Sequence, residues 1–395
     1  MPHSSTSNRS ISPNPTASAL GEFGLIERYF NRAQATRNAT TQATQATKAT
    51  KATKATQATQ ATQATQATQA TQATVVLGIG DDCALLSSTP GHHWAVSTDT
   101  LVEGRHFFAN VDPVHLGHKA LAVNLSDLAA CGATPRCFTL GLTLPHVNEA
   151  WLSGFSRGLL ALADQYDCTL VGGDTTQGPL NIAITVMGEV PQGQALRRSG
   201  ARVGDDIWVS GTLGDARLGL EVLQGKRQLN HLSHMSSETL QYAQHRLECP
   251  TPRVALGVAL RGVATSAIDL SDGLLGDLGH LLKSSGLASG LASSLGAEIH
   301  TDWIEGSNDV SNAISPFLKN LELNDRLSLV LAGGDDYELL FTVPASLRPT
   351  VLALAKRLET PLTRIGVMVS QEGLRVLGSE GQEVKVQQHS YEHFS

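Results

Sequence analysis

Residues 42–74 are eleven consecutive triplets of Gln-Ala-Thr or Lys-Ala-Thr. The stretch has no large apolar side chain, so burial cannot repay the entropy of ordering it. A period of three residues also drifts around a helix of about 3.6 residues per turn, so no stable apolar face forms. We expect residues 34–74 to be a disordered low-complexity insert, with an interaction arm as the alternative. The fold must then be built from the rest of the chain.

The insert separates two apolar segments that could belong to one domain. We expect a disordered polar tail at 1–20 and an N-terminal segment of the first domain at 21–33. Because the cost of closing a loop grows slowly with its length, the repeat can be a tolerated loop inside that domain. The first domain then continues at 75–192, and a second domain covers 193–395.

Short apolar runs and helical patterns alternate in both halves of the chain after the repeat. A turn-rich stretch at 190–206 separates the halves, and residues 286–326 are irregular. Strands are expected near 75–80, 94–98, 137–144, 168–172 and 181–190, with helices within 112–133 and 148–167. This alternation predicts an α/β (α+β) fold with two domains, each with a mixed sheet and packed helices.

Composition limits the classes of partner and compartment. A formal charge of −7 argues against nucleic acid as a main partner. No run approaches the roughly 20 apolar residues of a membrane span, and the polar start does not resemble a secretory signal. The five cysteines are scattered and fit neither a disulfide framework nor a CxxC zinc site. These features favour a reduced, cytoplasmic protein without a membrane segment.

Aspartates recur beside glycine, serine or threonine at the ends of apolar segments. One such aspartate is usually a turn former or a helix N-cap, and Asp272 could be only a cap. Recurrence at six places makes independent capping less persuasive, and strand ends are where α/β folds usually place ligands. The set is Asp81, Asp82, Asp99, Asp127, Asp174, Asp269, Asp272, Asp335 and Asp336.

Clustered carboxylates require cations, and hard oxygen ligands beside Ser and Thr suit Mg²⁺ or Mn²⁺. Zinc would favour His or Cys ligands, and none is spaced for it in the sequence. The chain has no GxxxxGK[ST] loop, no HRD or DFG set, and no complete GxGxxG. Since magnesium can bridge carboxylate and phosphate, the pattern indicates a metal–nucleotide site.

Several segments, in order, resemble the thiamine-monophosphate kinase family of the aminoimidazole-ribonucleotide-synthetase-like ATP-binding superfamily. The resemblance covers nearly the whole chain apart from the N-terminal tail and the repeat. The segments are GEFGLIERYF, LGIGDDCALL, STDTLVEGRHF, KALAVNLSDLAACGATPR, LVGGDTTQGPL, RSGA, SAIDLSDGL, GGDDYELLFTV and the terminal YEHF.

The resemblance implies a homodimer that phosphorylates thiamine monophosphate with ATP and several Mg²⁺ ions. It assigns metal binding to Asp82, Ser97, Thr98, Asp99, Asp127, Asp174, Asp269 and Asp272. It assigns ATP contacts to Gly173, Asp174, Arg198 and Ser271, and thiamine-side contacts to His106, Asp335 and Phe394. Asp81 is left open as a turn residue or a neighbour of the metal ligands.

One position departs from the family pattern. The family usually reads GGEDYEL, whereas this chain reads GGDDYEL, so Asp335 keeps the charge on a side chain one methylene shorter. On residue type alone, His106 could be a loop histidine, Arg198 a surface arginine and Phe394 a core aromatic.

The implied chemistry needs no general base. The acceptor is a phosphate monoester with a second pKa of about 6, so it is largely dianionic at neutral pH. We therefore expect direct in-line transfer, with aspartates as metal holders. Aminoimidazole-ribonucleotide synthetase is the enzyme alternative, and an inactive metal- or nucleotide-binding protein is the alternative from another class.

Overall fold

The computed structural model describes residues 22–30, 74–80, 82–225, 236–288, 295–305 and 313–384. The chain divides into two compact units, residues 1–52 and 53–395. In the first unit the described residues form helix α1 (Glu22–Leu25) and the π-helical segment η1 (Ile26–Phe30). The expected disorder at 1–20 and 34–74 falls outside the described residues, except at Thr74.

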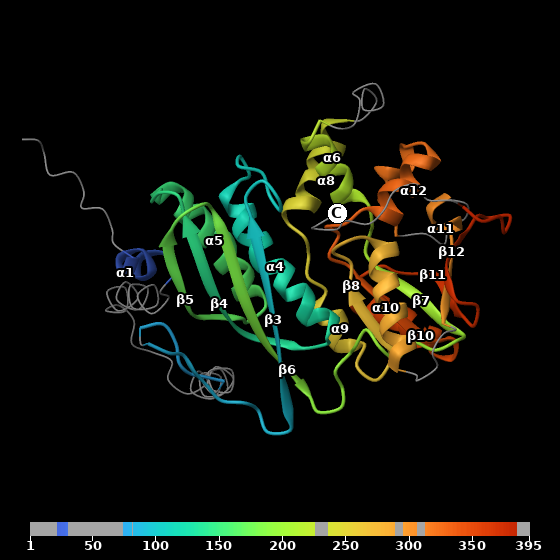
Figure 1. Ribbon diagram of the computed structural model, residues 1–395, viewed down its shortest axis with the longest axis horizontal. Helices are drawn as coiled ribbons and strands as arrows, with labels where there is room; N and C mark the ends of the chain where they lie inside the picture. The colour runs from blue at the N-terminus through green and yellow to red at the C-terminus, as the bar shows by residue number, and fades with distance from the viewer. Residues whose placement is uncertain are drawn as a thin grey trace, which may run out of the picture. The chain divides into compact units, whose positions relative to one another are not determined.

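A four-stranded mixed sheet forms the first half of the second unit (Figure 1). Its strands, in spatial order, are β3 (His92–Val102), β6 (Asn181–Pro191), β4 (Thr134–Leu144) and β5 (Thr169–Gln177). β4 and β5 are parallel, and the other neighbours are antiparallel. Two short strands, β1 (Val75–Leu77) and β2 (Leu85–Leu86), form a separate antiparallel pair. The strands expected in this half are confirmed.

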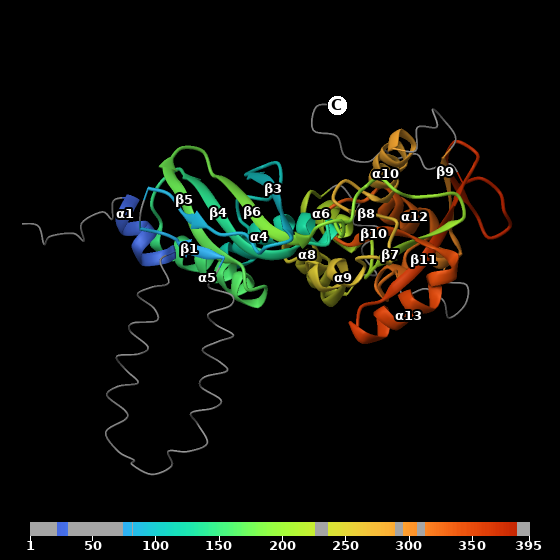
Figure 2. The same ribbon diagram turned by 90° about the horizontal axis from the view of Figure 1, so that it is seen from below.

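Two long helices, α4 (Pro113–Ala130) and α5 (Glu149–Gln165), pack together and cover one face of this sheet (Figure 2). α4 begins sharply because the Asp112 carboxylate accepts the Val114 N–H at 2.8 Å and Pro113 occupies the first turn. Along β6, buried and half-buried residues alternate, so one face meets the helices and the other stays partly open.

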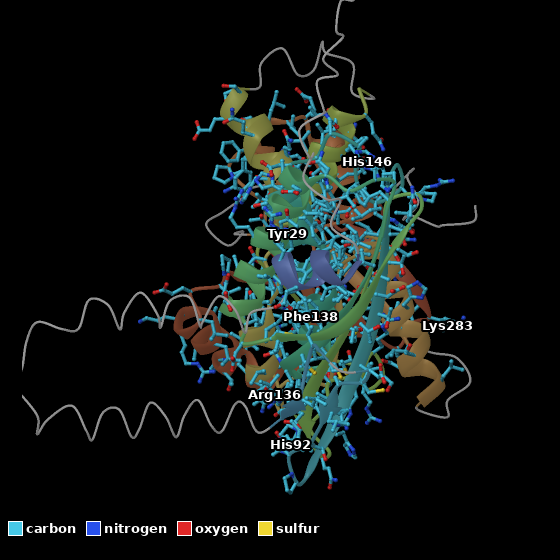
Figure 3. All side chains as sticks on the ribbon, turned by 90° about the vertical axis from the view of Figure 1, so that its left-hand side faces the viewer. Tyr29, His92, Arg136, Phe138, His146 and Lys283 are labelled. Carbon is cyan, nitrogen blue, oxygen red and sulfur yellow. The ribbon has the colours of Figure 1, made fainter. Side chains whose placement is uncertain are left out.

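The side chains of β4 illustrate this packing (Figure 3). Phe138 is fully buried in the core of the first half. Nearer the lower end of the sheet in that view, Arg136 pairs with Glu189, with Nε 3.1 Å from Oε2. Glu189 also accepts the backbone N–H and the hydroxyl of Thr89, each at 2.7 Å, which ties the entry of β3 to β6.

A six-stranded mixed sheet forms the second half. Its strands, in spatial order, are β12 (Gly373–Leu377), β9 (Gly296–His300), β11 (Leu362–Val369), β7 (Asp205–Ser210), β10 (Leu339–Pro344) and β8 (Ser266–Asp269). β12 and β9 are parallel, and the remaining pairs are antiparallel. β9 lies inside the stretch 286–326 that the sequence left unassigned.

Helices and helical turns accompany this sheet in chain order. They are α6 (Asp215–Leu223), α8 (Ser237–Glu248), α9 (Val254–Ala259), α10 (Leu274–Ala288), α11 (Asp302–Glu305), η2 (Leu318–Asn320), α12 (Leu323–Ala332), η3 (Ala345–Leu347) and α13 (Arg348–Arg357). Their core includes Ile207, Val209, Ile299 and Leu340, which are fully buried. α4 packs against β8, α8 and α9, so it links the two sheets.

Both sheets mix parallel and antiparallel neighbours and carry packed helices. The predicted fold class is therefore confirmed, while the predicted domain limits stay predictions. Among the residues described here, no helix is long and apolar enough to cross a membrane.

Candidate active site

Three carboxylates from different elements meet where the two sheets approach each other. Asp99 is on β3, Asp127 is on α4, and Asp269 ends β8. The Ser97 hydroxyl donates a short hydrogen bond to Asp127, and the Ser126 hydroxyl donates to Asp269 at 2.8 Å. Hydroxyl groups therefore orient two of the three carboxylates.

Burial and mutual repulsion raise the pKa values of this cluster. Burial, followed by the charge of Asp127, raises the pKa of Asp99 to about 6. The same two causes raise the pKa of Asp269 to about 7. Burial raises the pKa of Asp127 as well, although Ser97 and Arg198 oppose that shift. Buried and half-buried carboxylates and hydroxyls form a hard oxygen donor set, which fits Mg²⁺ better than a nitrogen- or sulfur-preferring ion.

The cluster lines a pocket of about 690 Å³. This pocket brings together seven of the residues predicted from the sequence, drawn from both halves of the second unit. They are Asp99, His106, Asp127, Asp269, Ser271, Asp272 and Asp335. Lys119 also lines the pocket and was not predicted, because a single lysine inside a helical pattern carries no motif.

Lys119 connects the residues expected on the substrate side. Its ammonium lies 2.9 Å from Asp335 Oδ1 and 3.5 Å from the carbonyl oxygen of His106. His106 Nδ1 accepts the Val102 N–H at 2.9 Å, so the ring proton of the neutral histidine is on Nε2. The buried ammonium of Lys119, on α4, therefore contacts both the Asp335 carboxylate and the backbone of His106.

A second pocket, of about 300 Å³, lies on the other side of the same carboxylates. Asp127 and Asp269 line both pockets. On this side they are joined by Ser97, by the predicted Arg198 and by Arg197, which was not predicted. Asp127 and Asp269 therefore lie between a pocket that includes Arg197 and Arg198 and a pocket that includes Arg105, His106, Lys119 and Arg217.

Asp277 shapes the loop that carries Ser271 and Asp272. Its carboxylate accepts the backbone N–H groups of Ser271, Asp272 and Gly273, each at 3.1 Å. Burial, followed by the charge of Asp272, raises the pKa of Asp277 to about 7. Three backbone donors at one carboxylate fix the loop at the start of α10. This role was not predicted, because Asp277 lies within a helical pattern.

The GGDDYEL segment contains both pocket and structural acids. The Asp335 N–H donates to the carbonyl of Ser271 at 2.9 Å, so the loops of Asp335 and Asp272 are joined. A Cβ atom on Gly334 would lie 2.4 Å from the same carbonyl, which explains the glycine. Glu338 is fully buried and binds Arg253 through two contacts of 2.6 Å, whereas Asp336 accepts the Gly214 N–H.

Four predicted residues lie apart from these pockets. Because side chains alternate along a strand, Thr98 faces away from Asp99, and its hydroxyl lies 2.8 Å from that of Thr185. Asp82 is exposed after β1. Gly173 and Asp174 lie on edge strand β5, three strand positions from β3 in the sheet. Asp81 and Phe394 lie outside the described residues.

Comparison with known proteins connects this arrangement to a family. Residues 80–190 match the family described as AIR synthase related protein, N-terminal domain. Over 379 residues the chain is 42% identical to thiamine-monophosphate kinase of Salmonella typhimurium, covering 95% of this chain and 99% of that protein. The chain belongs to the thiamine-monophosphate kinase family. The predicted family and enzyme class are therefore confirmed.

Solved structures of this family show the same fold. The crystal structure of thiamine-monophosphate kinase from Stenotrophomonas maltophilia K279a is 43% identical, with a TM-score of 0.69. That match covers 82% of this chain and 96% of that chain. A structure of AaThiL complexed with AMPPCP and TMP is 29% identical, with a TM-score of 0.61, over 84% of this chain and 96% of that one. The roles assigned to individual residues stay predictions.

Proposed function

We propose that the chain transfers the terminal phosphoryl group of ATP to thiamine monophosphate, forming thiamine diphosphate. The observation that carries the proposal is the position of Asp127 and Asp269, which line two neighbouring pockets. A kinase whose acceptor is a phosphate must bring two anions to one point, which carboxylate-held cations between two pockets allow. The ATP analogue and TMP bound by AaThiL support this choice of substrates.

The carboxylates and hydroxyls of the cluster would hold magnesium. Asp99, Asp127 and Asp269 are the central ligands in this proposal, with Asp272 at the edge of the pocket. When bound, Mg²⁺ neutralises charge on the phosphate oxygens and aligns them. The raised pKa values of Asp99 and Asp269 show that their ionised forms are unfavourable without a positive charge nearby. A bound cation would stabilise these ionised carboxylates.

The protein's own groups bind and orient the two substrates. On the side of the 300 Å³ pocket, Arg198 offers a planar donor to the phosphates of ATP. On the side of the 690 Å³ pocket, Asp335 supplies negative charge to the cationic thiazolium ring, and His106 offers its Nε2 proton. No side chain has to remove a proton, because the acceptor phosphate is already largely a dianion.

A second copy of the chain would complete this site. Asp99 and Asp174 are separated by three strand spacings, roughly 14 Å, so they cannot share one ion within one chain. Asp174 is exposed on an edge strand, and the open face of the sheet carries Val96 with 61% of its surface exposed. We propose that this face forms a homodimer that brings Asp174 of one chain to the site of the other.

The deciding experiment measures thiamine diphosphate formed from thiamine monophosphate, ATP and Mg²⁺, with thiamine as the control acceptor. We expect product only with the monophosphate, together with one ADP per turnover. Phosphorylation of thiamine alone would refute the substrate assignment. Release of free phosphate with a formylglycinamidine ribonucleotide would favour the synthetase alternative. Trapping a phosphorylated side chain during turnover would refute direct transfer.

A further inference from the structure

His115, His245 and Cys249 bring three metal-binding side chains together outside the carboxylate cluster. One ligand atom from each residue lies within 4.8 Å of the other two. His115 is in the first turn of α4, whereas His245 and Cys249 lie in the last turn of α8 and at its C-cap. The two imidazole rings are nearly perpendicular, with centroids 5.8 Å apart. The group therefore bridges two helices from distant parts of the sequence.

Neighbouring groups orient the His115 ring for metal binding and hold the backbone that follows Cys249. His115 Nδ1 lies 2.8 Å from a carboxylate oxygen of Glu248, and the Glu248 side chain is 9% exposed. With Nδ1 donating to Glu248, Nε2 is the atom that can bind a metal. A carboxylate behind a histidine is the usual arrangement around metal-bound imidazoles. His118 donates to the carbonyl of Pro250 at 2.8 Å, which fixes the backbone after Cys249.

The surroundings of His245 and Cys249 also suit a cation. Partial burial of the otherwise exposed His245, followed by the neighbouring His115, lowers the pKa of its imidazole, which favours the neutral form that coordinates a metal. Burial, followed by Glu248 and Asp112, raises the pKa of the Cys249 thiol to about 12. The negative charges of Glu248 and Asp112 disfavour a free Cys249 thiolate but attract a cation. A metal ion that displaces the thiol proton would therefore neutralise the thiolate and remove this repulsion.

We propose that His115, His245 and Cys249 form a binding site for one borderline-soft divalent transition-metal ion such as Zn²⁺. Two imidazoles and one thiolate are the donors that zinc prefers, and magnesium prefers oxygen. In tetrahedral zinc sites the ligand atoms lie about 3.5 Å apart, so modest side-chain rotations close this group around an ion. The fourth position is left for water.

The ion would join two helices that border the 690 Å³ pocket. Glu248, which orients His115, also lines that pocket. Lys119 lies four residues after His115, which is about one turn along α4. Coordination would fix the spacing of α4 and α8 at this edge of the pocket. The proposal depends on the geometry of the three ligands and not on the reaction catalysed.

The test is a titration of the full, metal-stripped chain with Co²⁺, which reports thiolate coordination through a sulfur-to-metal charge-transfer band. We expect one Co²⁺ per chain with this band, and displacement of Co²⁺ by Zn²⁺. Cys249→Ser should abolish the band. His245→Gln should weaken Zn²⁺ binding by at least about tenfold. Because His245 is exposed, its replacement should leave the circular dichroism spectrum unchanged.

Two matched controls separate this site from other metal-binding groups. Cys83→Ser removes an exposed thiol elsewhere, and Asp99→Asn weakens the carboxylate cluster; both should keep the band. In the unsubstituted chain Zn²⁺ should raise the thermal unfolding midpoint, and this rise should shrink in His245→Gln. The proposal is overturned if the band survives Cys249→Ser, disappears in Cys83→Ser or Asp99→Asn, or never forms at one ion per chain.

Discussion

The ammonium of Lys119 lies 2.9 Å from the carboxylate of Asp335, a residue 216 positions away in the chain. The two partners differ in exposure, with 4% of the Lys119 side chain and 30% of the Asp335 side chain accessible to solvent. Water can therefore compensate Asp335 if the pair is broken, but it cannot easily reach Lys119. This contact joins α4 to the loop before β10.

That asymmetry predicts unequal effects of removing each partner. Asp335→Asn strands a buried ammonium and should lower the free energy of unfolding by about 1–3 kcal/mol. Lys119→Met leaves a solvated carboxylate and should cost less. Asn also tolerates the positive φ of 66° at this position, so backbone strain does not confuse the comparison. Urea unfolding of both single variants and the double variant measures the coupling energy between Lys119 and Asp335. Equal losses of stability in the single variants that add up in the double variant would contradict the prediction.

Metal-free protein should lose stability as pH rises from about 4 to 7. The pKa values of Asp99 and Asp269 are raised to about 6 and about 7, mainly by burial and then by Asp127. Between the unfolded and folded pKa values the native state binds more protons than the unfolded chain, so the free energy of unfolding falls with rising pH. The loss is complete above about pH 7.

Denaturant unfolding in a chelator, at about pH 5 and about pH 8, measures this effect. Mg²⁺ should restore more stability at the higher pH, because it binds the ionised carboxylates. Asp269→Asn should flatten the pH dependence without Mg²⁺. A stability that rises across this window in the chelator would contradict the proposed cause.

The proposed homodimer predicts complementation between two inactive variants. Asp99→Asn and Asp174→Asn should each reduce turnover by roughly 10³-fold or more while leaving the circular dichroism spectrum unchanged. If Asp174 acts in the partner's site, a mixed dimer contains one intact site. Random mixing should then recover roughly a quarter of the unsubstituted activity.

The control for this experiment mixes each variant with itself, which should recover nothing. Near-normal turnover in Asp99→Asn would remove Asp99 from the metal site. Two inactive variants that fail to complement after subunit exchange, verified by mass, would place Asp174 outside the partner's site.

Gly173 and Gly172 offer a matched pair of substitutions on β5. A Cβ atom at Gly173 would lie 1.9 Å from the carbonyl oxygen of Leu140, and its φ of 153° disfavours other residues. Gly173→Ala should therefore lower the free energy of unfolding by more than about 2 kcal/mol. Gly172 has nothing within 4 Å of the same position, so Gly172→Ala should stay within about 0.5 kcal/mol. Thermal unfolding compares them, and equal losses would contradict the close approach.

Patterns local in sequence predicted much of the fold and part of the site. The sequence pattern correctly placed Asp269 at a strand end and Asp127 on a helix, whereas Asp99, expected just after a strand at 94–98, lies within β3. The predicted metal-binding role of Thr98 does not fit the alternation of side chains along β3. Thr98 is next to Asp99 in sequence, so its side chain faces the other side of the sheet. β9 was not predicted, because it is a short segment inside irregular sequence and is stabilised by pairing with β11 and β12.

Roles that depend on distant partners could not be predicted. Lys119 needs Asp335, and Asp277 needs the backbone of a loop whose shape is set by tertiary contacts. The same holds for His115, whose proposed co-ligands His245 and Cys249 follow about 130 residues later along the chain, too far for any spacing rule. Within GGDDYEL, Glu338 is fully buried against Arg253 whereas Asp335 is partly exposed beside Lys119, and neither the burial nor the partner can be read from the sequence.

Helix α4 carries Lys119 and, eight residues later, Asp127. With a rise of about 1.5 Å per residue, the helix sets these two side chains about 12 Å apart along its axis. In the proposed reaction, this one helix would set the distance between the organic end of the acceptor and the place where its phosphate reacts. Inserting a single residue between them would rotate Lys119 by about 100° relative to Asp127. The length of this helical segment therefore fixes the relative orientation of the two ends of the proposed site.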